Sequence, residues 1–570
     1  MAMAPANSAH SAEQDVAIQR QRSIDQAVDE GHDADIPSDL GYVLSETASR
    51  IRRSSNAAPS IKKPKHSSVP GVDTHEGDVE KNTGGSSSTP NDVATASEEE
   101  EEEGEDSANI VWWDDNDPQN PYNWPTWRKV LNCGLVSCLT FLTPLASSVF
   151  APGVPQLMRE FKSTNTELAA FVVSIYVLGF AFGPLLLAPL SEIYGRTILY
   201  HICNLGFIAF VIGCALAPTL EALIVFRFFS GLFGSCPITN GGGTIADMIP
   251  QEKRAAAMSV FTIGPLLGPI IGPVIGGFLA DVEGWRWNFW LLAILGGFIA
   301  ICMILVLRET YAPVLLQRKT QKLRAETGNA NLRSKLDIGL SPRDYFSRSI
   351  VRPLKMLAFS PVCQIFSIYI AIVYGYLYLM FTSITPVFEQ YYGFTTSNVG
   401  LVFLGMGVGS MLGLLYYSLT SDGYSRKMAA ADGQGMKPEY RLKLLPLGAL
   451  ILPAGFFLYG WTAEYRVHWI VPILGHVLIG IANLIIFMSM QLYLVDTFSM
   501  YAASALAANT VVRSVAGAVL PLVGIRMYNV LGLGWGNSLL GFIALVMVPG
   551  AFALLRYGEY LRTRFQVKNL

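Results

Sequence analysis

The sequence predicts an all-α membrane protein with twelve transmembrane helices in two six-helix repeats. Three observations support this fold class: an apolar composition, a series of long apolar segments, and an internal repeat. Of the 570 residues, 51% are hydrophobic and only 15% are charged. A soluble globular protein of this size carries more charge. Much of the apolar surface is therefore expected to face a lipid bilayer.

Residues 1–110 are predicted to form a disordered tail. They are rich in Ser, Asp, Glu, Ala and Gly, contain few aromatic residues, and include an acidic run at 98–103. A segment of this composition cannot bury enough apolar surface to fold by itself. It also lacks the apolar core of a signal peptide, so the first transmembrane segment is expected to direct membrane insertion.

Apolar segments of about 20 residues, the length a helix needs to cross a bilayer, recur from Val130 onward. We assign six to an N-terminal half (111–308) and six to a C-terminal half (360–557), joined by a basic linker loop (309–359) and followed by a short tail (558–570). The predicted spans are 130–152, 167–190, 198–217, 220–246, 256–281, 286–308, 360–388, 397–420, 443–462, 468–495, 500–527 and 536–557.

Basic residues gather on one side of the predicted membrane. That side carries the linker, the C-terminal tail, and loop residues such as Arg128, Lys253 and Lys427, whereas the other side has only a few, such as Arg159 and Arg466. Lys and Arg accumulate in cytoplasmic loops. The sequence therefore predicts a multi-pass protein, placed in the plasma membrane, with the linker and both termini in the cytoplasm.

The two halves repeat a short polar motif. A Ser-acid-x-Tyr-x-Arg pattern follows span 2 at 191–196 and span 8 at 421–426, and an aspartate closes spans 4 and 10. Two halves in the same orientation place a ligand site near the bilayer midplane between them. We interpret the motif as an inner gate that latches the halves together, with a tight turn and one basic anchor as the alternative. Its charged residues are Glu192, Arg196, Asp422 and Arg426.

These features resemble the major facilitator superfamily, and specifically its fungal twelve-span drug:proton antiporter branch. The resemblance runs from about Asp117 to the last span and includes a pre-span signature at 117–124. It implies the major facilitator fold and proton-coupled export of drugs, polyamines or a secondary metabolite. Because a fold does not fix the direction of transport, an uptake permease or uniporter of the same superfamily stays open as the alternative.

Span 5 carries glycines four residues apart with interleaved prolines, which resembles the antiporter motif. Glycines at this spacing form a flat strip on one helix face, which lets another helix approach closely. We expect the strip to pack between the two halves, with generic packing as the alternative. Its residues are Gly264, Gly268, Pro269, Gly272, Pro273, Gly276 and Gly277.

Two arginines lie inside predicted spans, where a charge is costly unless it faces protein or water. Arg227 in span 4 matches the span-4 arginine that the superfamily is thought to use in proton relay, and pairing with backbone carbonyls is the alternative. Arg513 in span 11 follows Asn509 in a signature that resembles the same branch. The partner of Arg513 is left open between a carbonyl, a carboxylate from the end of a span, and substrate.

Further candidates complete a proton and substrate pathway. Tyr374 and Tyr378 share one helix face and could stack on flat apolar ligands, although tyrosines also line membrane interfaces. Asp247 and Asp496 are the candidate proton carriers. Because Arg254 lies near only the first of them in sequence, we expect Asp496 to be the more proton-labile, with Glu389 at the end of span 7 as a rival.

No nucleophile–base pair, metal-ligand cluster or phosphate-binding loop is found in the sequence, and no basic patch with interleaved aromatics indicates nucleic acid. The glycines at 241–243 lack the Lys that a phosphate loop needs. We therefore expect no enzymatic activity, no cofactor and no metal. The expected partners are a small-molecule substrate, protons and the lipid bilayer, for a protein that works as a monomer.

Overall fold

The computed structural model describes residues 109–565 except 115, 251–253, 338, 433–436 and 499–500. Nearly all of the predicted tail, Lys253 and the last five residues therefore lie outside the described residues. Within the described part of the chain, twelve helical segments are long and apolar enough to cross a membrane. The predicted fold class is thereby confirmed.

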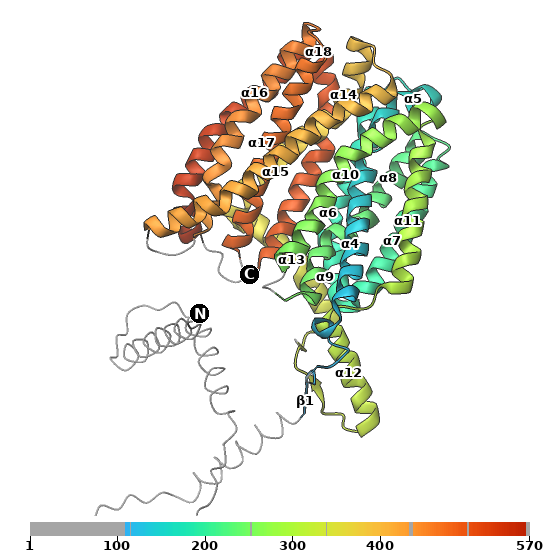
Figure 1. Ribbon diagram of the computed structural model, residues 1–570, viewed down its shortest axis with the longest axis vertical. Coiled ribbons are helices and arrows are strands. Elements are labelled where there is room, and N and C mark those ends of the chain that lie inside the picture. The colour runs from blue at the N-terminus through green and yellow to red at the C-terminus, as the bar shows by residue number, and fades with distance from the viewer. Residues whose placement is uncertain are drawn as a thin grey trace, which may run out of the picture. The chain divides into compact units, whose positions relative to one another are not determined.

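Helices of the N-terminal half lie beside those of the C-terminal half (Figure 1), and the halves meet where α6 packs on α18 and α10 packs on α15. The N-terminal half contains α4 (Thr126–Ser148), α5 (Val154–Glu160), α6 (Thr166–Tyr194), α7 (Arg196–Ala215), α8 (Leu220–Gly234), α9 (Cys236–Met248), α10 (Arg254–Glu283) and α11 (Arg286–Val306). The C-terminal half contains α14 (Pro361–Tyr392), α15 (Thr396–Asp432), α16 (Leu445–Glu464), α17 (Ile470–Thr497) and α18 (Ala502–Arg564).

Some spans are built from two pieces. Span 1 joins α4 to α5 through the short helix η2 (Ala151–Gly153), span 4 joins α8 to α9, and span 9 begins with η4 (Pro438–Leu444). The label α18 covers spans 11 and 12, which a non-helical Gly532 separates with φ 75°. Glu464 of α16 caps the start of span 12 by accepting the N–H of Leu533 at 2.7 Å.

The linker between the halves holds two helices and a short strand, namely α12 (Ala312–Thr327), β2 (Arg333–Ser334) and α13 (Pro342–Phe359). Helix α12 ends at Gly328, which has the left-handed conformation typical of helix C-termini. Helix α13 begins at the N-cap Ser341, whose hydroxyl accepts the N–H of Asp344 at 3.2 Å. We call the end of the helical bundle that carries these elements the linker end.

The segment before span 1 docks on the linker. Strand β1 (Ile110–Val111) pairs in parallel with β2, and Lys319 of α12 donates to Asp114 at 2.7 Å and to Asp117 at 2.8 Å. Burial acts to raise the pKa of Asp117, but the hydrogen bonds from Lys319 and from the N–H of Gln119, with the charge of Lys319, outweigh it and leave the pKa below its usual value. The pre-span signature therefore fixes α12 to the start of the N-terminal half.

Four glycines of the strip on α10 pack within their own half, so the expectation that the strip packs between the halves is wrong for Gly264, Gly268, Gly272 and Gly276. A methyl group on Gly268 would lie 2.8 Å from backbone atoms of α4, and one on Gly276 would overlap the carbonyl oxygen of Val149. Two residues of the strip approach α15 of the other half. A methyl group on Gly277 would lie 2.7 Å from the carbonyl oxygen of Thr396, and one on Gly400 would lie 2.6 Å from the carbonyl oxygen of Pro273. The reason is helical geometry: residues four apart share a face, and the next residue is turned by about 100°.

Candidate functional site

A buried arginine joins three helices in the middle of the N-terminal half. Arg227 of α8 donates to the carbonyls of Ala146 at 2.8 Å and Ser147 at 3.2 Å, both in the last turn of α4. It also donates to Val172 at 3.2 Å and Val173 at 3.3 Å in α6. Carbonyls in the last turn of a helix lack an intrahelical partner. The sequence left a proton relay and pairing with backbone carbonyls as the two interpretations of Arg227, and the structure shows the pairing with carbonyls.

Tyrosines of α14 connect this arginine to the C-terminal half. The Tyr378 hydroxyl donates to Ser147 Oγ at 3.2 Å, which is a contact between the halves. The rings of Tyr374 and Tyr378 are 5.1 Å apart. Tyr374 also lies near Gly517 of α18, which Val177 of α6 approaches as well. The two predicted tyrosines therefore stand where the halves meet, and Ser147, which the sequence interpretation missed, is the residue that receives them.

Arg513 of α18 lies on the C-terminal side of these tyrosines. Its guanidinium carbon is 5.2 Å from the ring centre of Tyr374 and 5.3 Å from that of Phe487 in α17. One turn away, Asn509 donates to Gln491 of α17 at 3.4 Å. The predicted residues Arg227, Tyr378, Tyr374, Arg513 and Asn509 thus form one contiguous group, here called the central cluster.

Helix periodicity explains how the C-terminal part of this cluster arises. Tyr374 and Tyr378 are four residues apart on α14, as are Asn509 and Arg513 on α18. On α17, Phe487 lies four residues before Gln491. Residues at this spacing share one face. Three helices therefore turn a polar and aromatic face toward the same place, and Phe487 could have been found from this spacing.

The two aspartates lie apart from the central cluster, at the linker end. Asp247 of α9 pairs with Arg196 at 3.3 Å, and its side chain is 17% exposed. Asp496 of α17 pairs with Arg441 of η4 at 3.1 Å, and its side chain is 38% exposed. Arg254, expected to act on Asp247, donates instead to the backbone carbonyls of residues 246 and 249. The reason given for preferring Asp496 as the proton carrier is therefore wrong.

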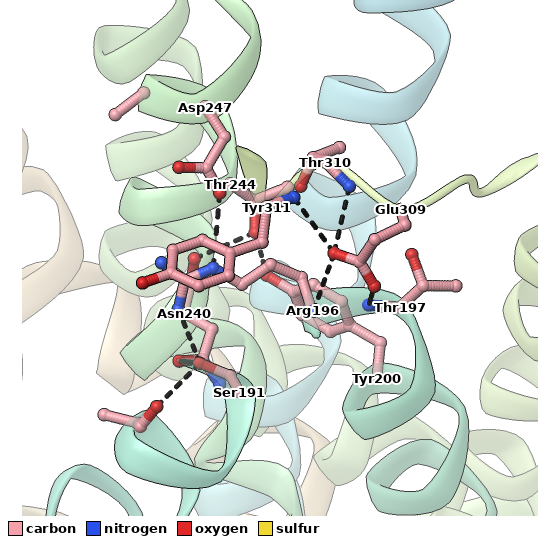
Figure 2. Close-up of polar contacts among 12 residues, drawn as sticks. Ser191, Arg196, Thr197, Tyr200, Asn240, Thr244, Asp247, Glu309, Thr310 and Tyr311 are labelled. Atoms are coloured by element: carbon pink, nitrogen blue, oxygen red, sulfur yellow. Dashed lines mark hydrogen bonds and ion pairs between the residues drawn. The ribbon is translucent and has the colours of Figure 1, made fainter. Parts of the chain in front are cut away.

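Glu309, just after α11, holds the start of α7 in place (Figure 2). Its carboxylate accepts the N–H groups of Arg196 at 2.9 Å, Thr197 at 3.1 Å, Thr310 at 3.0 Å and Tyr311 at 3.0 Å. A carboxylate at a helix N-terminus satisfies free N–H groups and is favoured by the helix dipole. The motif at 191–196 is therefore anchored by a residue that the sequence interpretation did not include.

The Arg196 side chain is enclosed by polar groups (Figure 2). Its Nη1 donates to Ser191 Oγ, which in turn bonds Asn240 Oδ1 at 3.0 Å. The ring of Tyr311 lies over the guanidinium at 4.7 Å. Burial, together with the negative charge of Glu192, raises the pKa of Tyr311 to about 12, so this ring is neutral at physiological pH.

The second copy of the motif folds differently. Gly195 has φ 102° and ψ 158°, which ends α6 and turns the chain so that Arg196 begins α7. Ser425 stands at the matching position, and α15 continues through it as helix to Asp432. Arg426 is consequently exposed, and among the described residues it has no ion-pair partner. The expected equivalence of Arg426 with Arg196 is wrong in the structure.

Arg441 takes the place expected for Arg426. It bonds Asp422 at 2.8 Å and Asp496 at 3.1 Å. It also lies in η4, near the start of span 9, as Arg196 stands at the start of span 3. Each half therefore has one arginine at the linker end that holds the aspartate closing its fourth helix.

The predicted latch between the halves is also revised, because neither copy of the motif pairs directly with the other. Tyr345 of α13 donates to Glu192 of α6 at 2.6 Å. Further along α13, Met356 packs with Ala505 and Ala508 of α18. The linker helix α13, and not a direct ion pair, thus spans from one half to the other at the linker end.

A cavity of about 770 Å³ separates the halves at the opposite end. It is lined by parts of α5, α6, α14 and α18, and its charged residues are Arg159, Asp281 and Glu389. Glu389, the rival proton carrier, therefore lies in this cavity and not in the central cluster. The halves are joined by α13 at the linker end, and at the opposite end they meet beside the cavity, where Ser397 donates to Asp281 at 2.8 Å and Arg526 pairs with Glu167 at 3.4 Å.

Comparisons with known proteins agree with this architecture. A family model described as Major Facilitator Superfamily matches residues 136–521. The MFS-type transporter tndD of Aspergillus flavipes is 58% identical over 458 residues, which cover 80% of this chain and 85% of the relative. The MFS-type transporter penM of Penicillium rubens is 55% identical over a stretch that covers 80% of this chain and 90% of the relative. The efflux pump radE of Floropilus chiversii is 50% identical and covers 80% and 86%.

Solved structures share the fold at low sequence identity. A D-xylose-proton symporter aligns with a TM-score of 0.55 and 16% identity, over 73% of this chain and 96% of that chain. A bacterial homologue of the human lysosomal transporter Spinster aligns with a TM-score of 0.57 and 13% identity, over 78% and 100%. At these identities the likeness concerns the fold alone.

Proposed function

The chain belongs to the major facilitator superfamily, and we propose that it exports small organic compounds in exchange for protons. As a multi-pass membrane transporter it is not an enzyme, in line with the names of its relatives. The observation that carries the proposal is the enclosed pair of Asp247 and Arg196 at the linker end. Beyond that pair lies a central cluster to which both halves contribute.

Proton coupling needs an acid whose protonation differs between the two access states of the carrier. Asp247 suits this role better than Asp496, because its side chain is less than half as exposed, at 17% against 38%. Its partner Arg196 begins α7 and is fixed by Glu309, so a movement of α7 would change the charge next to Asp247. We therefore assign proton binding to Asp247.

Two observations favour export over uptake. One similar protein bears the name efflux pump, and the glycine–proline strip of span 5 resembles the antiporter motif. An uptake permease of the same superfamily is the alternative. It predicts that cells producing the protein accumulate more of a transported compound, whereas export predicts that they accumulate less.

We further propose a plasma-membrane location with the linker end and both termini in the cytoplasm. The basic residues of the linker end support this orientation. An epitope tag inserted at 329–331, in the turn between α12 and β2, should be labelled by antibody only after permeabilisation. Labelling of intact cells would contradict the orientation.

Inside-out membrane vesicles test the coupling. The substrate is a fluorescent compound selected because pump-deficient yeast accumulate less of it when they produce the protein. Wild-type uptake should require an imposed proton gradient. Such a gradient can drive concentrative uptake, because a unit charge moving through 100 mV gains about 2.3 kcal/mol from the membrane potential alone. A protonophore should abolish it. Concentrative uptake without a gradient would refute antiport.

The residue assignment has its own test in the same vesicles. Asp247→Asn should lose gradient-driven uptake, and Asp496→Asn, the matched change in the other half, should retain most of it. Intact gradient-driven uptake in Asp247→Asn would overturn the assignment to Asp247 and leave antiport standing.

A further inference from the structure

The two arginines of the central cluster differ in how their charge is accommodated. Arg227 is buried and donates to four backbone carbonyls. Arg513 makes no hydrogen bond or ion pair with any described residue, and its Nε atom is buried without an acceptor. The first arginine therefore has a structural role in the N-terminal half, whereas the second presents donors that the protein leaves unused.

Within the part of the chain that the structure describes, Arg513 has no counter-ion. The groups that lie over its guanidinium are the rings of Tyr374 and Phe487, and among the described residues no carboxylate pairs with it. The acids of the C-terminal half have other partners or places: Asp422 and Asp496 pair with Arg441, Asp432 accepts from Tyr440, Glu439 pairs with Arg562, Glu464 caps span 12, and Glu389 lines the cavity at the opposite end. A guanidinium inside a membrane span that lacks both acceptor and counter-ion is costly, and such residues mark ligand pathways.

We propose that Arg513 binds the anionic group of the transported compound, and that the cargo is a flat aromatic organic acid with a carboxylate or an acidic phenol or enol. This inference rests on the proposed transport function and names the substrate class of its central cluster. It narrows the substrates expected from the family resemblance, because a positive centre without a counter-ion disfavours polyamines and cationic drugs.

The chemistry of the neighbouring groups fits such a ligand. A guanidinium presents donors in a planar fork that matches a carboxylate with two parallel hydrogen bonds. Tyr374 and Phe487 flank the guanidinium at 5.2 and 5.3 Å and offer aromatic faces beside it. Beside them, Asn509 Oδ1 is buried and has no partner among the described residues.

Arg513 also lies close to the contact between the two halves. It is partly exposed, unlike the buried Asn509. Its neighbour Tyr374 and Val177 of α6 both approach Gly517 of α18, and Tyr378 contacts Ser147 of α4. A ligand held by Arg513 and these tyrosines would therefore touch both halves, as a carrier that alternates between two access states requires.

Binding to purified protein in nanodiscs, without any gradient, tests the inference. The probes are matched aromatic acids and their carboxamides, including coumarin-3-carboxylate with coumarin-3-carboxamide and naphthalene-2-carboxylate with its amide. At pH 7.5 wild type should bind the acids at least about tenfold more tightly than the amides. Arg513→Gln should remove this preference and leave amide binding within about twofold, and Arg513→Lys should retain part of it. Arg526→Gln, at an exposed arginine that pairs with Glu167, is the control. It should change neither the preference for acids nor the affinity for amides.

Three results would overturn the proposal: no acid of the set binds, acids and amides bind equally to wild type, or the preference survives in Arg513→Gln. An equal loss of acid and amide binding in Arg513→Gln would assign a structural role to the residue and also overturn it. Because no gradient is applied, a failure of proton coupling leaves the outcome unchanged, so the two proposals fail separately.

Discussion

Replacing Gly195 by alanine should destabilise the protein because this glycine makes the turn between α6 and α7. Its φ of 102° and ψ of 158° lie in a region that is essentially restricted to glycine, and a side chain there costs about 1–3 kcal/mol. An added methyl group would also overlap the carboxylate of Glu309. The substitution therefore strains the backbone and displaces the group that caps α7.

The size of the second effect follows from the hydrogen bonds of Glu309, which accepts four backbone N–H groups. A hydrogen bond to a charged group contributes about 1.5–3 kcal/mol, and a shifted carboxylate keeps some of the four. Together the two effects predict a loss of about 2–5 kcal/mol in the free energy of unfolding. Gly423→Ala is the matched control in the other copy of the motif. A methyl group there meets open space, and alanine favours a helix by up to about 1 kcal/mol.

The assay is denaturant unfolding of purified protein in detergent, followed by tryptophan fluorescence, for wild type and both variants. Gly195→Ala should unfold at clearly lower denaturant, while Gly423→Ala should match or exceed wild type. If Gly195→Ala lay within about 0.5 kcal/mol of wild type, the reasoning about this turn would be refuted. Equal losses in the two variants would also refute it.

Three further predictions concern packing and contacts at the linker end. Gly268→Leu should overpack α10 against α4, lower the free energy of unfolding by about 1–3 kcal/mol and abolish transport by protein that reaches the membrane. Gly297→Leu is the control and should transport normally, because a side chain there meets open space. Normal transport by both variants would contradict the packing of α10 on α4. Arg441→Gln should lower the free energy of unfolding by about 0.5–2 kcal/mol, because it removes two partly exposed ion pairs. Arg426→Gln should leave the free energy of unfolding unchanged. A larger loss in Arg426→Gln than in Arg441→Gln would restore the predicted equivalence of Arg426 with Arg196. Tyr345→Phe removes the bond between α13 and α6 and should speed hydrogen exchange in α13, so unchanged exchange would argue against the bridge.

The spans could be predicted from sequence because each one is an apolar stretch whose length is imposed by the bilayer. The partner of an arginine could not, because it depends on where the chain turns. Arg196 and Arg426 close the same pattern, yet Gly195 permits a sharp turn and Ser425 continues a helix. The glycine-to-serine difference was visible in the sequence, and its consequence follows from backbone conformation alone.

The central cluster was partly predictable for a similar reason. Spacing by four residues on spans 7, 10 and 11 indicates which side chains share a face. It does not indicate that the faces converge, since that depends on how the helices pack. The partners of Arg227 were less accessible still, because they are backbone carbonyls exposed where α4 ends at Ser148, and a sequence pattern does not reveal carbonyl groups.

The docking of the pre-span segment on α12 divides the linker into two parts with different attachments. Strand β2 and Lys319 belong with the N-terminal half, whereas α13 leads directly into α14 and packs on α18. The boundary between them is the short stretch 335–341. A carrier made as two separate polypeptides, divided in this stretch, should therefore reassemble in the membrane, because each fragment keeps the contacts that position its own share of the linker. The covalent connection would then be dispensable, and the protein could be studied as a split molecule whose two parts are labelled independently.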